Sequence, residues 1–139
     1  MIEYEFGKLL EKLIYFSSQK NYSLAITLGY DVSYISKWIN SSTLPTSKNI
    51  KVINQKISDF IVSSCDESEL ENIINYLHIN ITEWDDVPTL LKNTIEDELN
   101  KAYLYSYNKN RKKEIKESGN YNNSIQTTQS SFIKKYVSD

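Results

Sequence analysis

Apolar residues recur along most of the chain at the spacing of an amphipathic helix. The first such stretch begins at Phe6 and ends at Tyr15 or Phe16, ahead of a polar run that starts at Ser17. Its other apolar positions are Leu9, Leu10, Leu13 and Ile14. These positions share one face of a helix, so the pattern predicts a helix that packs against other elements through that face.

Two shorter helices joined by a tight turn are predicted between Asn21 and Ile39. Their apolar positions are Leu24, Ala25 and Leu28 in the first helix and Ile35 and Trp38 in the second. Gly29 directly follows the first stripe, and glycine adopts the left-handed conformation that ends many helices without a steric penalty. Asp31 then supplies a side-chain oxygen that can cap the free amides of the next helix. This is the pattern of a helix-turn-helix.

A loop and a fourth helix are predicted next. Pro45 lies near the end of the loop 40–46, and Thr46 or Ser47 is expected to cap the helix that follows. The apolar positions of that helix are Ile50, Ile53, Ile57, Phe60 and Ile61. These four helices can close a single apolar core, and we expect Trp38 to lie near its centre.

Beyond residue 64 the pattern predicts a helical extension. Asp66 and Glu69 have the spacing of a capping box, and residues 80–86 are expected to connect this helix to a longer one that Pro88 opens. The apolar stripes are Leu70, Ile73, Ile74 and Leu77 in the first helix and Leu91, Ile95, Leu99 and Ala102 or Tyr103 in the second. The second helix can continue through Tyr107 into the basic residues 109–116.

The predicted fold is therefore all-α, with three parts. Residues 1–64 form a four- to five-helix domain, residues 65–117 form a helical extension for dimerisation or packing, and residues 118–139 form a polar tail that is expected to lead into a missing domain. The tail is rich in Ser, Asn, Gln and Thr and cannot bury enough apolar surface to fold alone. Only three Gly and two Pro occur in 139 residues, which favours long helices over a many-turned β fold.

Composition narrows the setting of the protein. A single cysteine, Cys65, excludes an intramolecular disulfide, and acidic residues occupy the N-terminal positions where a signal peptide would be basic. No apolar run approaches the length that spans a membrane. We therefore expect a soluble cytoplasmic protein without membrane contact, and the abundance of Asn, Ile, Lys and Tyr favours a low-GC bacterium or its phage.

The formal net charge of −2 conceals a segregation of charge along the chain. Residues 1–62 contain 7 Lys and 5 acidic residues, a balance of +2. Residues 63–100 contain 1 Lys and 10 acidic residues, a balance of −9, whereas residues 101–139 contain 8 Lys or Arg and 3 acidic residues, a balance of +5. The middle segment is expected to avoid phosphates, and the two ends are free to approach them.

Over roughly Phe6 to Phe60 the sequence resembles the lambda-repressor-like, or XRE-type, helix-turn-helix family. The residues that carry the resemblance are Leu24-Ala25, Leu28-Gly29, Asp31 to Ser33, Ile35, Trp38 and Pro45. It implies that the two short helices cross closely at a small residue and that the second enters the major groove of DNA. The family often has Glu and Gly just after that helix, where this chain has Ile39 and Ser41. Asn40, which tolerates left-handed geometry, can end the helix instead.

The resemblance also implies which side chains contact double-stranded DNA. Carried over residue by residue, it places on the groove-facing helix, or at the start of the preceding one, Asn21, Val32, Ser33, Tyr34, Ser36, Lys37 and Asn40. Lysine donates to guanine O6 and N7, serine donates and accepts, and Val32 can contact a thymine methyl group. Tyr34 is expected to pack or to reach a phosphate. The alternative interpretation is that these residues are merely solvated.

Catalytic and metal-binding patterns are absent from the sequence. His78 and Cys65 cannot complete a zinc site of the usual ligand count, and neither HExxH, CxxC nor a glycine-rich phosphate loop occurs. We interpret His78 as an ordinary helix residue and the carboxylates of 66–71 as a solvated helix start. The expected protein is not an enzyme, and it needs neither cofactor nor metal.

The leading hypothesis is a sequence-specific, DNA-binding transcriptional regulator whose helix 31–40 contacts base edges. Because one such helix covers few base pairs, two copies are expected to bind half-sites roughly 34 Å apart. The stripe of the long helix is predicted to pair them, or else to fold back on the helix of Leu70 to Leu77. The alternative function is a protein-interaction module that uses the helix-turn-helix as a scaffold and the acidic segment as its binding surface.

Overall fold

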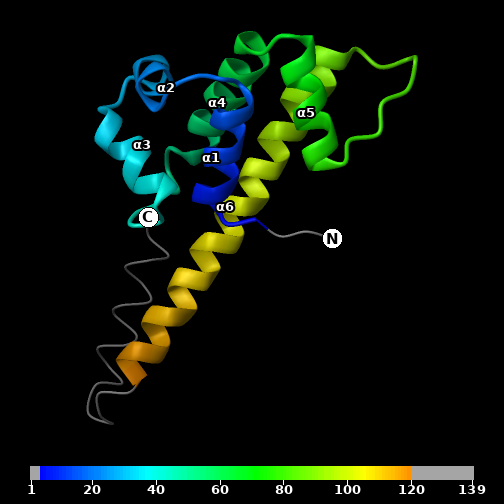
Figure 1. The fold of residues 1–139 in the computed structure, drawn as a ribbon. Helices are drawn as coiled ribbons and strands as arrows, with labels where there is room; N and C mark the ends of the chain where they lie inside the picture. The colour runs from blue at the N-terminus through cyan, green and yellow to red at the C-terminus, as the bar shows by residue number, and fades with distance from the viewer. Residues whose placement is uncertain (1–3, 120–139) are drawn as a thin grey trace.

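The computed structural model describes the backbone of residues 4–119 and the side chains of residues 4–112. It contains six helices in this range and no strand, so the predicted all-α fold is confirmed (Figure 1). The helices are α1 (Phe6–Phe16), α2 (Asn21–Leu28), α3 (Val32–Ile39), α4 (Ile50–Ser64), α5 (Glu67–Leu77) and α6 (Val87–Gly119). The predicted polar tail lies outside the described residues from position 120 onward.

The turn between α2 and α3 forms as its local sequence predicts. Gly29 ends α2 with a φ of 78°, and the backbone N–H groups of Gly29 and Tyr30 both donate to the carbonyl of Ala25, at 2.9 and 3.0 Å. Asp31 precedes α3, and its Oδ1 accepts a hydrogen bond from the backbone N–H of Ser33 at 2.9 Å. The glycine end and the aspartate cap are both confirmed.

The helix α3 ends at Asn40, as the sequence allows, but Asn40 does not adopt the left-handed conformation. Asn40 ends the helix with a φ of −85°, and it is Ser41 that adopts the left-handed conformation, with a φ of 65°. The Oδ1 of Asn40 accepts from the backbone N–H of Ser42 at 2.9 Å, which fixes the side chain in a turn. The positive φ therefore falls one residue later, at the position where the family often has glycine.

Two other helix ends also differ from the predictions. Neither Thr46 nor Ser47 caps α4; the carbonyl of Thr46 instead accepts from the N–H groups of Asn49 and Ile50, both at 3.0 Å, so a turn precedes the helix. His78 follows the last residue of α5 with a φ of 55° and is not a helix residue. The Asp66 capping box is confirmed in full.

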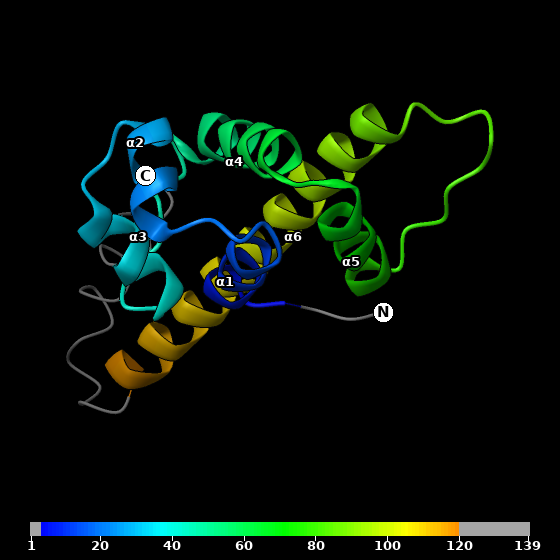
Figure 2. The ribbon, with the colours of Figure 1, turned by 45° about the horizontal axis from the view of Figure 1, so that its top comes forward.

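The two longest helices and α1 hold the molecule together. The helix α6 packs along α4 and α1, and α1 also contacts α3 and α5 (Figures 1 and 2). One core includes side chains from all six helices: Phe6, Leu9, Leu10, Leu13, Ile14, Leu24, Ala25, Leu28, Ile35, Trp38, Ile53, Ile57, Ile61, Ile73, Ile95, Leu99, Ala102 and Tyr103. The predicted central position of Trp38 fits its exposure of 3%.

The apolar stripe of α6 is buried within a single chain. Leu91, Ile95 and Leu99 are fully buried, and Tyr103 nearly so. The neighbours of α6 are chiefly α4 and α1, and not the Leu70 to Leu77 helix that the sequence suggested. This stripe is consequently unavailable to a second copy of the chain, and the extension acts as a packing element at this face.

Polar contacts fix α6 against the rest of the molecule. The backbone N–H of Phe6, at the start of α1, donates to Ser106 Oγ at 2.8 Å, and the Tyr103 hydroxyl donates to the carbonyl of Pro45 at 2.9 Å. Asn54, which is fully buried on α4, donates to Asn100 Oδ1 at 2.8 Å. Each bond joins residues far apart in sequence, and together they set the register of α6.

Candidate nucleic-acid interface

The helix-turn-helix lies at one end of the molecule. In both ribbon views α2 and α3 lie on the left, and the loop between α5 and α6 projects on the right (Figures 1 and 2). The helix α3 contacts α2 and α1, and it buries Ile35 and Trp38 against them. Its remaining surface faces solvent and is the candidate interface.

The predicted contact residues of α3 are all exposed to solvent, but the side chain of one of them is engaged in a turn. Those exposed on α3 or at its end are Val32, Ser33, Tyr34, Ser36, Lys37 and Asn40. Asn21, at the start of α2, is only half-buried and retains access to solvent. The engaged side chain is that of Asn40, whose oxygen accepts from Ser42, so only its amide nitrogen is left to contact a ligand.

A chain of aromatic rings links the interface to the core. The ring of buried Trp38 meets that of Tyr30 edge-on, with centroids 5.5 Å apart, and Tyr30 meets exposed Tyr34 at 5.6 Å. The ammonium group of Lys37 lies 6.0 Å from the centroid of the Tyr34 ring. Contacts of this kind restrain the side chains involved. The buried ring of Trp38 therefore helps to position Tyr34 and Lys37, two of the predicted DNA contacts.

Close packing of α1 holds α3 in place. A Cβ atom added at Gly7 would lie 2.2 Å from the carbonyl oxygen of Trp38 and 2.6 Å from that of Ile39. Real Cβ atoms do not approach backbone this closely, so only glycine allows α1 to pass the last turn of α3 at this distance. The orientation of the candidate interface therefore depends on α1 as well as on α2.

The electrostatics of α2 and α3 are compatible with an anionic partner. The only acidic residue of the segment 21–40 is Asp31, and its carboxylate is engaged by Ser33. The hydrogen bonds from the backbone N–H and the side chain of Ser33 hold the pKa of Asp31 below its ordinary value. Lys37 is exposed, and Lys20 directly precedes α2.

The helix starts differ in a way that bears on phosphate binding. The helices α3 and α5 have side-chain caps from Asp31 and Asp66, whereas α2 and α4 show no side-chain cap bond. First-turn amides without a side-chain acceptor can donate to a phosphate oxygen. Asn21 lies at the start of α2, and Lys48 and Lys51 flank the start of α4.

Two exposed residues on α2 were not among the predicted contacts. Tyr22 and Ile26 are 63% and 62% exposed, and they lie one helical turn apart on the face opposite the buried stripe. Their spacing from Leu24, Ala25 and Leu28 would have revealed them, since apolar residues off the core stripe are left in solvent. They are exposed apolar residues of α2.

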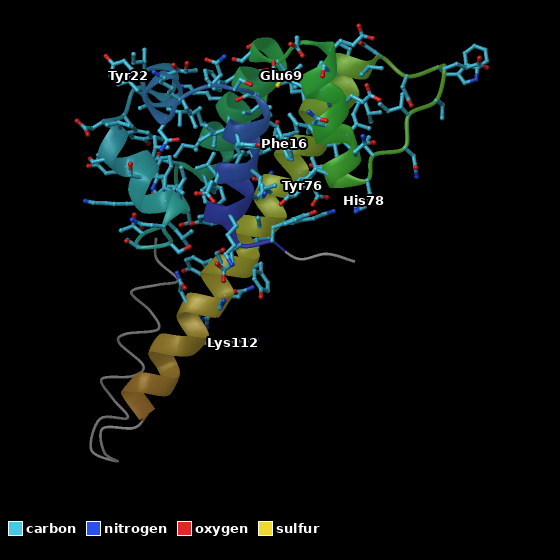
Figure 3. All side chains as sticks on the ribbon, in the orientation of Figure 1. Phe16, Tyr22, Glu69, Tyr76, His78 and Lys112 are labelled. Carbon is cyan, nitrogen blue, oxygen red and sulfur yellow. The ribbon has the colours of Figure 1, made fainter. Side chains whose placement is uncertain are left out.

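Elsewhere in the described part of the chain, other kinds of site are poorly supported. An open hollow of about 400 Å³ between α1, α5 and α6 is lined by Tyr4, Tyr76, Tyr105 and four charged side chains (Figure 3 shows Tyr76). Burial and the nearby carboxylates of Glu69 and Asp66 raise the pKa of Cys65 to about 11, so its thiol stays protonated and unreactive near neutral pH. The side chains described bring together no group of three metal ligands.

The comparisons with known proteins add no further support for a function. The chain matches no family model, no curated protein and no solved structure. In the range that the structure describes, none of the helices combines the length and apolar character needed to cross a membrane.

Proposed function

We propose that the protein is a sequence-specific, DNA-binding transcriptional regulator that inserts α3 into the major groove. The proposal is supported chiefly by one observation: α3 buries two apolar residues, and its other side exposes two serines, one lysine, a valine and a tyrosine. A helix held at one end of a molecule with such a surface has the dimensions and chemistry of a groove-reading helix.

The proposed division of roles follows the positions of the side chains. Ser33, Ser36 and Lys37 contact base edges, and Val32 lies against a thymine methyl group. The uncapped start of α2, with Asn21, donates to a backbone phosphate and sets the register of α3 in the groove. Tyr34 contacts the phosphate backbone while its ring restrains Lys37.

Salt dependence tests the proposal. Fluorescence anisotropy with a random duplex at about 50 mM salt should detect binding. The affinity should fall steeply as salt rises to about 200 mM, because lysines that bind phosphates release counterions from the DNA. Selection from random DNA should then enrich a defined sequence. Lys37→Ala removes the lysine of α3, and Lys12→Ala is its matched control. Lys12 also lies over a tyrosine ring, that of Tyr15, but it belongs to α1.

The protein-interaction module is the competing function, and the same experiment distinguishes it. If the chain fails to bind duplex DNA even at about 50 mM salt, α3 is not a DNA-reading helix. The acidic segment 63–100, with its balance of −9, would then be the principal recognition surface.

A further inference from the structure

Trp84 is the most exposed of the large apolar side chains that the structure describes. It is 87% exposed and belongs to the loop between α5 and α6, which projects away from the helices (Figures 1 and 2). We call residues 80–86 the finger. An exposed tryptophan contributes little to folding, but it is among the residues most enriched at the centres of protein interfaces.

Hydrogen bonds hold the finger in shape. The carboxylate of Asp85 accepts from the backbone N–H of Thr82 at 2.8 Å and from its hydroxyl at 3.1 Å, while the N–H of Asp85 donates to the Thr82 carbonyl at 3.2 Å. At the junction with α6, Asp86 accepts from the Thr89 hydroxyl at 2.8 Å. Trp84 therefore projects from a closed turn, so less conformational entropy would be lost when it binds a partner.

The charge around Trp84 restricts the partner that it fits. Glu83, Asp85 and Asp86 flank the ring, and the segment 79–91 contains neither lysine nor arginine. Such a surface repels phosphates, which argues against DNA and anionic lipid. It is complementary to an apolar side chain with basic neighbours.

The same chain presents that complementary surface on the distal half of α6. Leu104 is 58% exposed, and Lys101 and Arg111 lie three residues before it and seven after it, on the same side of the helix. The side chain of Lys101 is 70% exposed, and its ammonium group lies 3.5 Å from Glu98 Oε1 on the same helix. Between this surface and the finger, α6 leaves Asn93 and Asp97 exposed along the same side.

We propose that two copies of the chain pair antiparallel along this side of α6, with Trp84 of each copy against Leu104 of the other. Seventeen residues separate Val87 from Leu104, about 26 Å of helix at 1.5 Å per residue. A two-fold axis midway along that span makes both contacts at once, as an isologous interface requires. Asn93 and Asp97 then lie near the axis, where the amide of one copy donates to the carboxylate of the other.

The direction of pairing follows from charge. The finger end of α6 is acidic and the Leu104 end is basic, so antiparallel helices bring opposite charges together and parallel helices bring like charges together. This interface uses none of the buried stripe of α6. The finger itself lies at the end of the molecule opposite α3 (Figures 1 and 2).

The inference is independent of the proposed DNA binding, and it is tested on the full chain without DNA. Sedimentation equilibrium should give a dimer at tens of micromolar. Trp84→Ala should weaken dimerisation at least about a hundredfold, since each dimer loses two aromatic contacts. The matched control is Tyr15→Ala, which removes a 73% exposed aromatic ring from α1 and should leave the dimer unchanged.

A charge-reversal pair tests the reciprocal geometry. Glu83→Lys and Lys101→Glu should each weaken the homodimer, because each places like charges at both contacts. An equimolar mixture of the two variants should restore a dimer, since opposite charges then face each other at both contacts of the heterodimer. Circular dichroism of each variant verifies that the helices remain folded.

Three results would overturn the proposal. The wild-type chain could remain monomeric at tens of micromolar, or it could dimerise equally well with Trp84→Ala. It could also form open-ended assemblies that grow with concentration, which would mean that finger and Leu104 surface meet head to tail without a two-fold axis. Binding of duplex DNA by a monomeric chain would leave the proposed function intact while removing this inference.

Discussion

At the helix-turn-helix end, Trp38 is 3% exposed, its ring meets that of Tyr30 and its carbonyl lies close to Gly7 of α1, whereas at the finger Trp84 is 87% exposed. The same residue type thus fills the core at one end of the molecule and is exposed to solvent at the other. Around Trp38 the exposed charge is a lysine, and around Trp84 it is three carboxylates. The difference shows that composition cannot assign a role to an aromatic residue; its position relative to the helix stripes does.

The largest effect is expected when the buried tryptophan is removed. Trp38→Ala should lower the free energy of unfolding by about 3–5 kcal/mol, because a large side chain leaves a cavity in a small core. At protein concentrations low enough to keep the chain monomeric, Trp84→Ala should change it by less than about 0.5 kcal/mol, as for other exposed positions. Urea denaturation of the two variants measures the contrast; equal losses would mean that the finger packs against the body in solution.

A methyl group at Gly7 should act nearly as strongly on the same end. Gly7→Ala is expected to cost about 1–3 kcal/mol, because the new Cβ would overlap the carbonyls of Trp38 and Ile39 and force α1 away from α3. At Gly29 a Cβ meets nothing within 4 Å, and only the φ of 78° opposes substitution, so Gly29→Ala should cost about 1 kcal/mol. A larger loss at Gly29 than at Gly7 would contradict this assignment.

The candidate interface should respond in specificity and not in folding. Lys37→Ala should reduce discrimination between the selected DNA sequence and altered sites by about 1–3 kcal/mol while the melting temperature stays near that of the wild type. Ser33→Ala should act in the same direction. Equal loss on selected and random duplexes would reassign Lys37 to a phosphate contact, and Lys12→Ala should affect neither.

A glycine at the end of α3 should stabilise the protein. Ser41 holds a φ of 65°, a conformation that disfavours residues with a Cβ by about 1 kcal/mol. Ser41→Gly is therefore expected to raise the free energy of unfolding by a similar amount, less the entropy that glycine adds to the unfolded chain. Denaturant midpoints measure the gain, and a clear loss would show that Ser41 does not hold this conformation in solution.

The smallest expected effect depends on pH and concerns the cap of α3. The pKa of Asp31 is lowered, chiefly by the backbone N–H of Ser33, so its stabilising contribution is present above the ordinary value of 3.8 and is lost as pH falls through the lowered value. Asp31→Asn keeps a capping side chain without the titration. Between neutral and acidic pH, the melting temperature of the wild type should therefore fall slightly more than that of D31N.

Most of the helices and several of their ends could be predicted from the local sequence. The stripes of α1 to α4, the end at Gly29, the Asp31 cap and the Asp66 capping box each depend on residues within one or two helical turns. Their geometry is set by backbone conformation and by short-range hydrogen bonds, so the residue types suffice to predict them. The local errors, at Ser41 and at the start of α4, arose where neighbouring polar residues offered competing caps and turns.

Only the tertiary structure decided which surfaces cover each other. The sequence marked the α6 stripe as apolar, but α4 and α1 cover it, and Asn54 with Asn100 fixes the register. Likewise, nothing local distinguishes Gly7 as the residue on which the placement of α3 depends. An apolar stripe is stable only when it is buried, but any complementary helix face can bury it. Which helix does so depends on shape and on polar contacts between residues that are distant in sequence.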